Sequence, residues 1–188
     1  MQKKTQFFEI KEFPWAKEGD YMPKAMATLT YDDEGFEVYF KAYETPLRMK
    51  ETKHNTAVCE DSCVEFFVQF DPENDDTYIN FEMNPICTMC CGRGEGRHGR
   101  TPIPPEVIDT FPRHCEIHDD YWEAWLRIPL DYITREYPGY KHEEGTVIKA
   151  NLYKCGNDEL HPHFATWNYV VAPKPDYHRP EYFKEIVL

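Results

Sequence analysis

The residues best suited to chemistry lie on alternating segments of the chain, in which every second side chain is polar or aromatic. On the polar side, these segments present Tyr39, Lys41, Tyr43, Glu65, Glu82, Asn84, Trp125, Arg127, Asn151 and Tyr153. Aromatic rings stack on the C–H faces of sugars, while carboxylates, amides and cations pair with sugar hydroxyls. Such a face is suited to sugar binding. From alternation alone, the alternative interpretation is an ordinary solvent-exposed face that binds no ligand.

Cysteines are a second group of residues that could carry chemistry, as metal ligands or as redox-active thiols. Cys87-x-x-Cys90-Cys91 has a spacing found in zinc sites, and Cys59-x-x-x-Cys63 could supply a second pair of ligands. Cys63, however, opens a strand-like segment that would fix its direction. The seven cysteines are an odd number, and the first residues contain no apolar leader. We therefore expect reduced, buried, inert thiols in a cytoplasmic protein, with a secreted protein whose leader was removed as the alternative.

An acidic turn is the candidate calcium site. Asp71, Glu73, Asp75 and Glu82 occupy positions 1, 3, 5 and 12 of a calcium-loop template, but Asp76 stands where an EF-hand needs glycine. The EF-hand interpretation therefore fails. Clustered loop carboxylates can still bind calcium, so Asp71, Asp75 and Asp76 are its candidate ligands, with a solvated acidic turn as the alternative.

A glycine-rich segment also matches a known pattern. Residues 94–99 fit G-x-G-x-x-G, but Thr101-Pro102-Ile103-Pro104-Pro105 follows and cannot open the helix that a dinucleotide site requires. We interpret the segment as a loop carrying arginines, which could cover a ligand.

The elements that position these residues are mostly strands. Alternation with a period of two covers residues around 36–40, 64–70, 79–83, 122–128 and 148–152. Turn residues join several of them, and only 130–137, after Pro129, indicates a short helix. We expect one antiparallel β-sandwich over residues 1–188, with a long irregular loop at 86–112.

Composition and net charge argue against several classes of binding partner. The 188 residues carry a net charge of −13, are 41% hydrophobic, and include 15 prolines and 15% aromatic residues. A surface this negative repels phosphate backbones and anionic lipid, so nucleic acid and membranes are poor partners. No apolar run approaches the ~18 residues of a membrane span.

The order of several motifs resembles a known family. They are Asp61-Ser62-Cys63-Val64-Glu65-Phe66-Phe67, Tyr78-Ile79-Asn80-Phe81-Glu82-Met83-Asn84-Pro85, Ala150-Asn151-Leu152-Tyr153-Lys154-Cys155-Gly156, Phe164-Ala165-Thr166-Trp167-Asn168 and His178-Arg179-Pro180-Glu181-Tyr182-Phe183. In order and spacing they resemble carbohydrate-binding module family 9, among the DOMON-like β-sandwiches. The likeness runs from about residue 25 to the C-terminus.

The resemblance implies a non-catalytic module that binds mono- or oligosaccharides, often at a chain end, with structural calcium in some members. Glu65 matches the family's acidic sugar contact, Asn84 its amide contact, and Tyr177 the position of its second stacking ring. We expect these residues to border one pocket, with Trp167 as a wall. Glu82 stands where the family has a sugar-contacting arginine, and Cys59 or a neighbour stands where the first ring is expected.

The sequence also allows two other functions. Glu65 and Glu82 could form the carboxylate pair of a glycoside-cleaving enzyme. Some DOMON-like relatives bind haem, and Met83 or Met89 with a histidine could supply its ligands. The sequence does not predict the oligomeric state.

Overall fold

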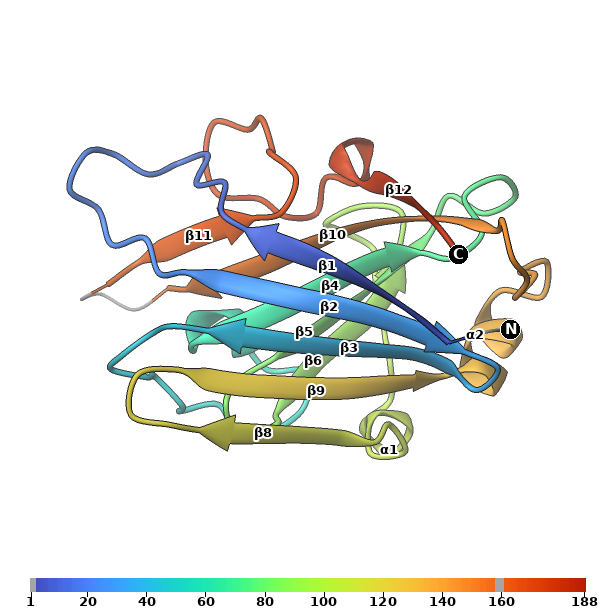
Figure 1. The fold of residues 1–188 in the computed structure, drawn as a ribbon, viewed down its shortest axis with the longest axis horizontal. Helices are drawn as coiled ribbons and strands as arrows, with labels where there is room; N and C mark the ends of the chain where they lie inside the picture. Colours follow the sequence, from blue (N-terminus) through green and yellow to red (C-terminus); the bar gives the residue numbers. More distant parts are fainter. Residues whose placement is uncertain (1–2, 158–160) are drawn as a thin grey trace.

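Two antiparallel sheets stacked face to face make up the protein (Figure 1), in a computed structural model that describes residues 3–157 and 161–188. The first sheet contains, in spatial order, β1 (Lys4–Ile10), β2 (Ala25–Asp32), β3 (Gly35–Ala42), β9 (Trp122–Pro129) and β8 (Arg113–Ile117). The second contains β11 (His163–Thr166), β10 (Val147–Gly156), β4 (Cys63–Gln69), β5 (Tyr78–Met83), β6 (Met89–Gly94) and β7 (Thr101–Pro102), with β12 (Lys184–Val187) also paired to β10. The predicted β-sandwich is confirmed.

Helices are short and lie between strands. They are η1 (Val58–Glu60), α1 (Pro105–Ile108), α2 (Leu130–Glu136) and η2 (Pro180–Tyr182). The predicted helix after Pro129 is α2, and it follows directly on β9, because Pro129 is both the last paired residue of that strand, opposite Gly35, and the N-cap of the helix. None of the described helices is long and apolar enough to cross a membrane.

The core fills the space between the sheets and follows the predicted alternation. On β4, for example, Val64, Phe66 and Val68 face inward and are completely or almost completely buried. Phe66 stacks on Phe81 of β5, with ring centroids 6.5 Å apart. Period-two patterning therefore assigned the inner faces correctly, because one parity of each strand must meet the opposite sheet.

The outer face of the second sheet is not solvated, which corrects one expectation. Glu65, Glu82, Asn84, Asn151 and Tyr153, expected on a wet face, are all buried. The reason is a cover formed by residues 48–62 and by the C-terminal segment 168–183. Hydrogen bonds fasten this segment to the sheet, such as that from the Tyr153 hydroxyl to the Tyr177 carbonyl oxygen (3.2 Å).

Residues 86–112 are also more regular than expected. They contain β6, β7 and α1, and β6 pairs along its length with β5. Arg100 anchors the turn between β6 and β7: its guanidinium donates to Asn80 Oδ1 (2.7 Å) and to the Gly92 carbonyl oxygen (2.7 Å). The cysteine- and glycine-rich composition of β6 hid this strand from hydrophobic patterning.

A buried polar network lies at one end of the sandwich. Lys154 Nζ is 2.8 Å from Glu44 Oε2, and it also donates to His163 Nε2 at 2.7 Å. The Trp122 indole and the Ser62 hydroxyl donate to the same Glu44 carboxylate, at 3.1 and 3.0 Å. The buried Lys154 charge is therefore compensated by an anion that is itself fully hydrogen-bonded.

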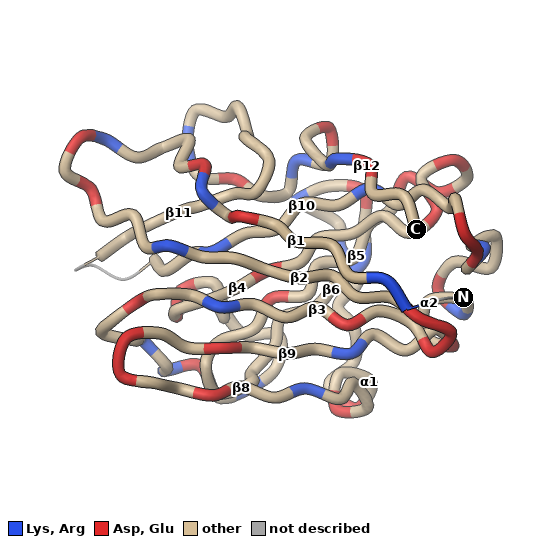
Figure 2. The backbone as a smooth tube through the Cα atoms, in the orientation of Figure 1, with Lys and Arg blue, Asp and Glu red and all other residues tan. Residues whose placement is uncertain are grey.

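Charged residues are unevenly placed along the backbone. Figure 2 shows Asp and Glu concentrated in turns, notably between β8 and β9 and between β2 and β3. Beside the turn between β2 and β3, Arg127 of β9 forms ion pairs with Asp32 and Glu37, so part of the excess negative charge is neutralised.

Candidate binding site

A cavity of about 490 Å³ opens on the outer side of the second sheet. Its floor is formed by Glu65 and Phe67 of β4, Glu82 of β5 and Cys155 of β10. The walls and mouth comprise Cys59, Arg97, Asn157, Phe164, Lys174, Pro175, Asp176, Tyr177 and His178. Its volume is typical of small-molecule sites, and it combines apolar rings with a few polar groups.

The strand register brings the two carboxylates together. Glu65 and Glu82 are paired residues on neighbouring antiparallel strands, so their side chains project side by side from the same face. Glu65 is 2% exposed and Glu82 is 6% exposed. Asn80 Nδ2 donates to Glu82 Oε1 at 3.0 Å, and Cys155 Sγ donates to Glu65 Oε1 at 3.0 Å.

Burial makes this acid pair reluctant to ionise. Burial raises the pKa of Glu65 above its usual value, and burial together with the neighbouring Glu65 carboxylate raises the pKa of Glu82 further. Among the described residues no lysine, arginine or histidine lies within ion-pair distance of either carboxylate. The floor of the cavity therefore offers two carboxyl groups that accept hydrogen bonds, and that also donate one when protonated, with no cation of its own.

Aromatic side chains line the cavity around these acids. Tyr177 stacks on Tyr153 with ring centroids 4.0 Å apart and planes at 9°, so one face of its ring is already covered. Its hydroxyl lies 3.1 Å from the carbonyl oxygen of Ala165, which fixes the ring in place. Phe67 stacks on Tyr78 and also contacts His178.

His178 is a neutral member of the wall. Burial lowers its pKa to about 4, and the nearby Arg100 and Arg97 lower it in the same direction. Its Nδ1 lies 2.8 Å from the Tyr78 hydroxyl. At neutral pH the imidazole therefore acts as a hydrogen-bonding group rather than a charge.

An ion pair stands at the mouth of the cavity. Arg97, from the glycine-rich turn, donates to Asp176 Oδ1 at 2.8 Å, which links that turn to the C-terminal segment. The structure thus places the turn beside the cavity, where sequence analysis allowed it to cover a ligand.

The structure brings together three of the five predicted sugar-binding residues. Glu65, Glu82 and Tyr177 line the cavity, whereas Asn84 and Trp167 do not. The Asn84 amide is used internally: it donates to the Glu51 carbonyl oxygen and to the carboxylate of Asp61. Trp167 packs edge-on against Phe8, with centroids 4.7 Å apart, on the core between the sheets.

The structure does not bring the predicted calcium ligands, Asp71, Asp75 and Asp76, together at one point. Asp75 accepts hydrogen bonds from Arg93 (2.6 Å) and from Thr77, and Asp71 accepts one from Asn74. Within residues 3–157 and 161–188, two groups of three metal-ligating side chains come within 4.8 Å of one another, and neither includes this turn. Cations and amides of the protein thus already satisfy Asp71 and Asp75.

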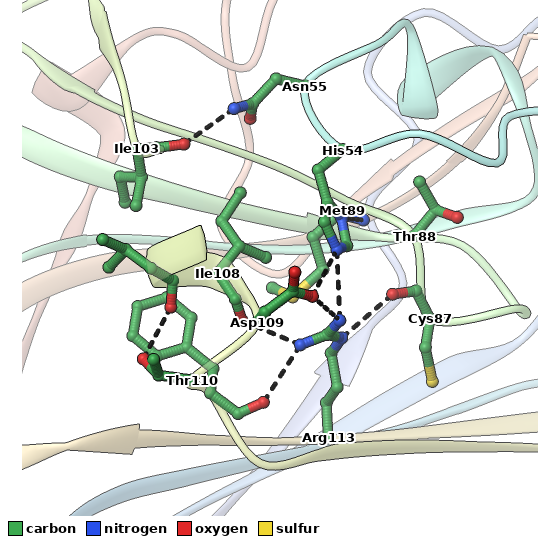
Figure 3. A network of polar contacts seen from close by, with 12 residues as sticks. His54, Asn55, Cys87, Thr88, Met89, Ile103, Ile108, Asp109, Thr110 and Arg113 are labelled. Carbon is green, nitrogen blue, oxygen red and sulfur yellow. Dashed lines mark hydrogen bonds and ion pairs between the residues drawn. The ribbon is translucent and has the colours of Figure 1, made fainter. Parts of the chain in front are cut away.

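The methionines considered for haem ligation lie in the core. Met83 and Met89 are 2% and 0% exposed. The Met89 amide donates to Nδ1 of His54, while Nε2 of the same ring faces Asp109 and Arg113 (Figure 3). Both ring nitrogens of His54 are therefore engaged in a network that joins α1 to the start of β6.

A larger hollow, of about 820 Å³, lies between β6, β7, α1 and α2. Both of the arginines that line it are already paired, Arg93 with Asp75 and Glu136, and Arg135 with Glu136. The 490 Å³ cavity is the better binding site because it alone of these two contains buried polar groups that are not paired with an opposite charge.

Sequence reasoning missed several residues of the cavity. Phe67 shares the parity of Glu65 on β4, so alternation contained the signal for it. Cys155 likewise shares the parity of Tyr153 on β10. Phe164 and His178 come from segments whose placement depends on contacts distant in sequence, and no local pattern marks them.

Comparisons with known proteins identify the family and the fold. The model of carbohydrate-binding family 9 matches residues 1–188. A Bacteroides uniformis protein, described provisionally as carbohydrate-binding, is 27% identical, with a TM-score of 0.85 over 97% of this chain and 85% of its own.

Two structures of a family 9 module from Caldicellulosiruptor kristjanssonii, in complex with cellotriose and with glucose, share the fold. They are 14% and 13% identical, each with a TM-score of 0.64 over 97% of this chain and 82% or 83% of theirs. No curated protein matches significantly. The match over the whole sequence shows that this chain belongs to carbohydrate-binding family 9, a family of non-catalytic binding modules.

Proposed function

We propose that this protein binds a mono- or oligosaccharide in the 490 Å³ cavity, using Glu65 and Glu82 as hydroxyl acceptors. The observation that carries the proposal is the opposed pair of buried carboxylates on the floor of a ring-lined cavity. The protein gives each of these buried carboxyl groups a hydrogen-bond donor, Cys155 for Glu65 and Asn80 for Glu82, but no cation, so sugar hydroxyls would add the further hydrogen bonds that the remaining oxygen can make.

The rings and the rim have complementary roles in this proposal. Phe164 and the part of Tyr177 that lines the cavity supply apolar surface for the C–H faces of a sugar, while the buried Phe67 ring packs behind them. Arg97, Lys174 and Asp176 lie at the mouth, where longer glycans would leave the cavity. Binding of the last unit of a chain is therefore favoured over binding along its middle.

Glucose and cellotriose are suitable first probes because family 9 structures of the same fold were obtained with them. A glycan array identifies the preferred ligand, and calorimetry then compares variants. Glu65→Gln replaces an acceptor oxygen with an amide donor, so we expect binding to weaken by about 10-fold or more. Glu73→Gln, on an exposed turn, is the matched control and leaves the affinity unchanged.

If Glu65→Gln and Glu73→Gln bind the array ligand equally well, with unchanged melting temperatures, the cavity is not the sugar site. The opposed carboxylates also make glycoside cleavage worth testing, because paired acids with raised pKa values are found in glycosidases. We expect no reducing sugar to be released from the glycans that the protein binds.

A further inference from the structure

Two thiols and a carboxylate meet at the inner end of the cavity. Their ligand atoms, Sγ of Cys63, Sγ of Cys155 and a carboxylate oxygen of Glu65, all lie within 4.8 Å of one another. Cys63 and Glu65 are two residues apart on β4 and so share a face, and Cys155 is the register partner of Cys63 on β10. All three side chains are at most 2% exposed.

We propose that Cys63, Cys155 and Glu65 form a binding site for a thiophilic divalent cation of the zinc class. This goes beyond sugar binding and does not depend on it. It also departs from the expectation, drawn from cysteine spacing, that the thiols are inert. Spacing suggested Cys59 and Cys63 with Cys87 and Cys90, whereas the fold joins cysteines 92 residues apart.

The separation of the ligand atoms suits such an ion. In a tetrahedral site with Zn–S bonds of about 2.3 Å, two sulfurs lie about 3.8 Å apart. Atoms already within 4.8 Å reach that spacing by small side-chain rotations. The strand pairing holds the three backbones in place, so little conformational entropy is lost when the ion binds.

The donor set determines the kind of metal. Two sulfurs and one oxygen favour zinc-class ions, because calcium and magnesium require oxygen ligands in larger numbers. On binding, the two thiols release their protons to solvent and coordinate as thiolates, together with the Glu65 carboxylate. No electron is transferred.

The cavity provides a route of entry and a fourth coordination position. Glu65 and Cys155 both line it, so an ion can reach them from solvent. Cys59 also lines the cavity, and its carbonyl oxygen is 3.5 Å from Cys155 Sγ. The open position therefore faces Cys59 and the space in which a sugar would lie, an arrangement typical of three-ligand zinc sites.

The chain contains a matched control for thiol chemistry. Cys87 and Cys115 are half-buried thiols, and Cys115 Sγ donates to the Asn84 carbonyl oxygen at 3.5 Å, but neither is part of either three-residue metal-ligating group in the described residues. Figure 3 shows the Cys87 sulfur pointing away from the surrounding polar network, whose arginine bonds its carbonyl oxygen instead.

The test uses Co²⁺ as a spectroscopic probe on reduced, chelator-treated protein without sugar. We expect one Co²⁺ per chain, with a thiolate-to-metal charge-transfer band in the near ultraviolet. The band is lost in Cys63→Ser and in Cys155→Ser, and it persists in the Cys87→Ser, Cys115→Ser double variant. Glu65→Gln keeps the band but weakens binding by about 10-fold or more.

Two results would overturn the site: no charge-transfer band in the parent protein, or a band that survives in both Cys63→Ser and Cys155→Ser. Circular dichroism shows whether each variant is folded, and having two single variants guards against one that fails to fold. Sugar binding is measured separately on metal-free protein, so failure of the metal site leaves the proposed function to its own test.

Discussion

Acidification should destabilise the fold through His178. Its pKa falls from an ordinary 6.5 to about 4 in the folded protein, because burial and two arginines disfavour the imidazolium. Between these values the unfolded chain binds a proton that the folded chain does not, so stability falls as the pH decreases from about 6.5 to 4. At about 1.4 kcal/mol per pH unit, the loss at pH 5 is about 2 kcal/mol and approaches about 3 kcal/mol near pH 4.

Urea unfolding at pH 7 and pH 5 measures this loss, and His178→Gln isolates it. Glutamine keeps an acceptor for the Tyr78 hydroxyl but does not titrate. Other groups titrate in both proteins. The raised pKa values of the buried glutamates, for example, increase stability as the pH falls. Because these contributions are the same in the parent and the variant, they cancel when the two losses of unfolding free energy are compared. The parent should lose about 2 kcal/mol more than the variant. Equal losses in the two proteins would mean that His178 is not the group responsible for the acid sensitivity.

Three substitutions test the packing that supports the cavity, each measured by urea unfolding. Lys154→Met leaves Glu44 buried without its cation and should cost about 3–5 kcal/mol; a neutral result would mean that the pair is replaceable. Gly35→Ala should cost at least about 1 kcal/mol, because φ is +129° and a Cβ would meet the Ile128 carbonyl oxygen; unchanged stability would show that the turn relaxes freely. Asp61→Ala removes the acceptor of two backbone amides, an arginine and an asparagine, so a loss of about 3 kcal/mol or more is expected, and a loss below about 1 kcal/mol would contradict it.

The strands with clean alternation were predictable because one parity must pack against the opposite sheet. β4, β5, β9 and β10 lie where period two places them. β6 was not predictable from pattern, since its Met-Cys-Cys-Gly sequence lacks alternation and it is defined by pairing with β5.

The candidate site was predictable only in part, for a different reason. Glu65 and Glu82 share a face by parity, and a short turn joins their strands, so their convergence follows from local rules. The cover over them comes from the C-terminal segment, whose contacts are set by long-range hydrogen bonds and no periodicity. Asn84 has the right parity but lies one residue beyond β5, where Asp61 and Glu51 take up its amide.

A crystal structure of the protein with the ligand selected by the glycan array would show directly whether a sugar occupies the cavity. We expect a sugar ring inside the 490 Å³ cavity, with hydroxyls within hydrogen-bond distance of Glu65 and Glu82 and a C–H face against Phe164 or Tyr177. A sugar bound in the hollow between β6 and α2, or on the outer face of the first sheet, would contradict it.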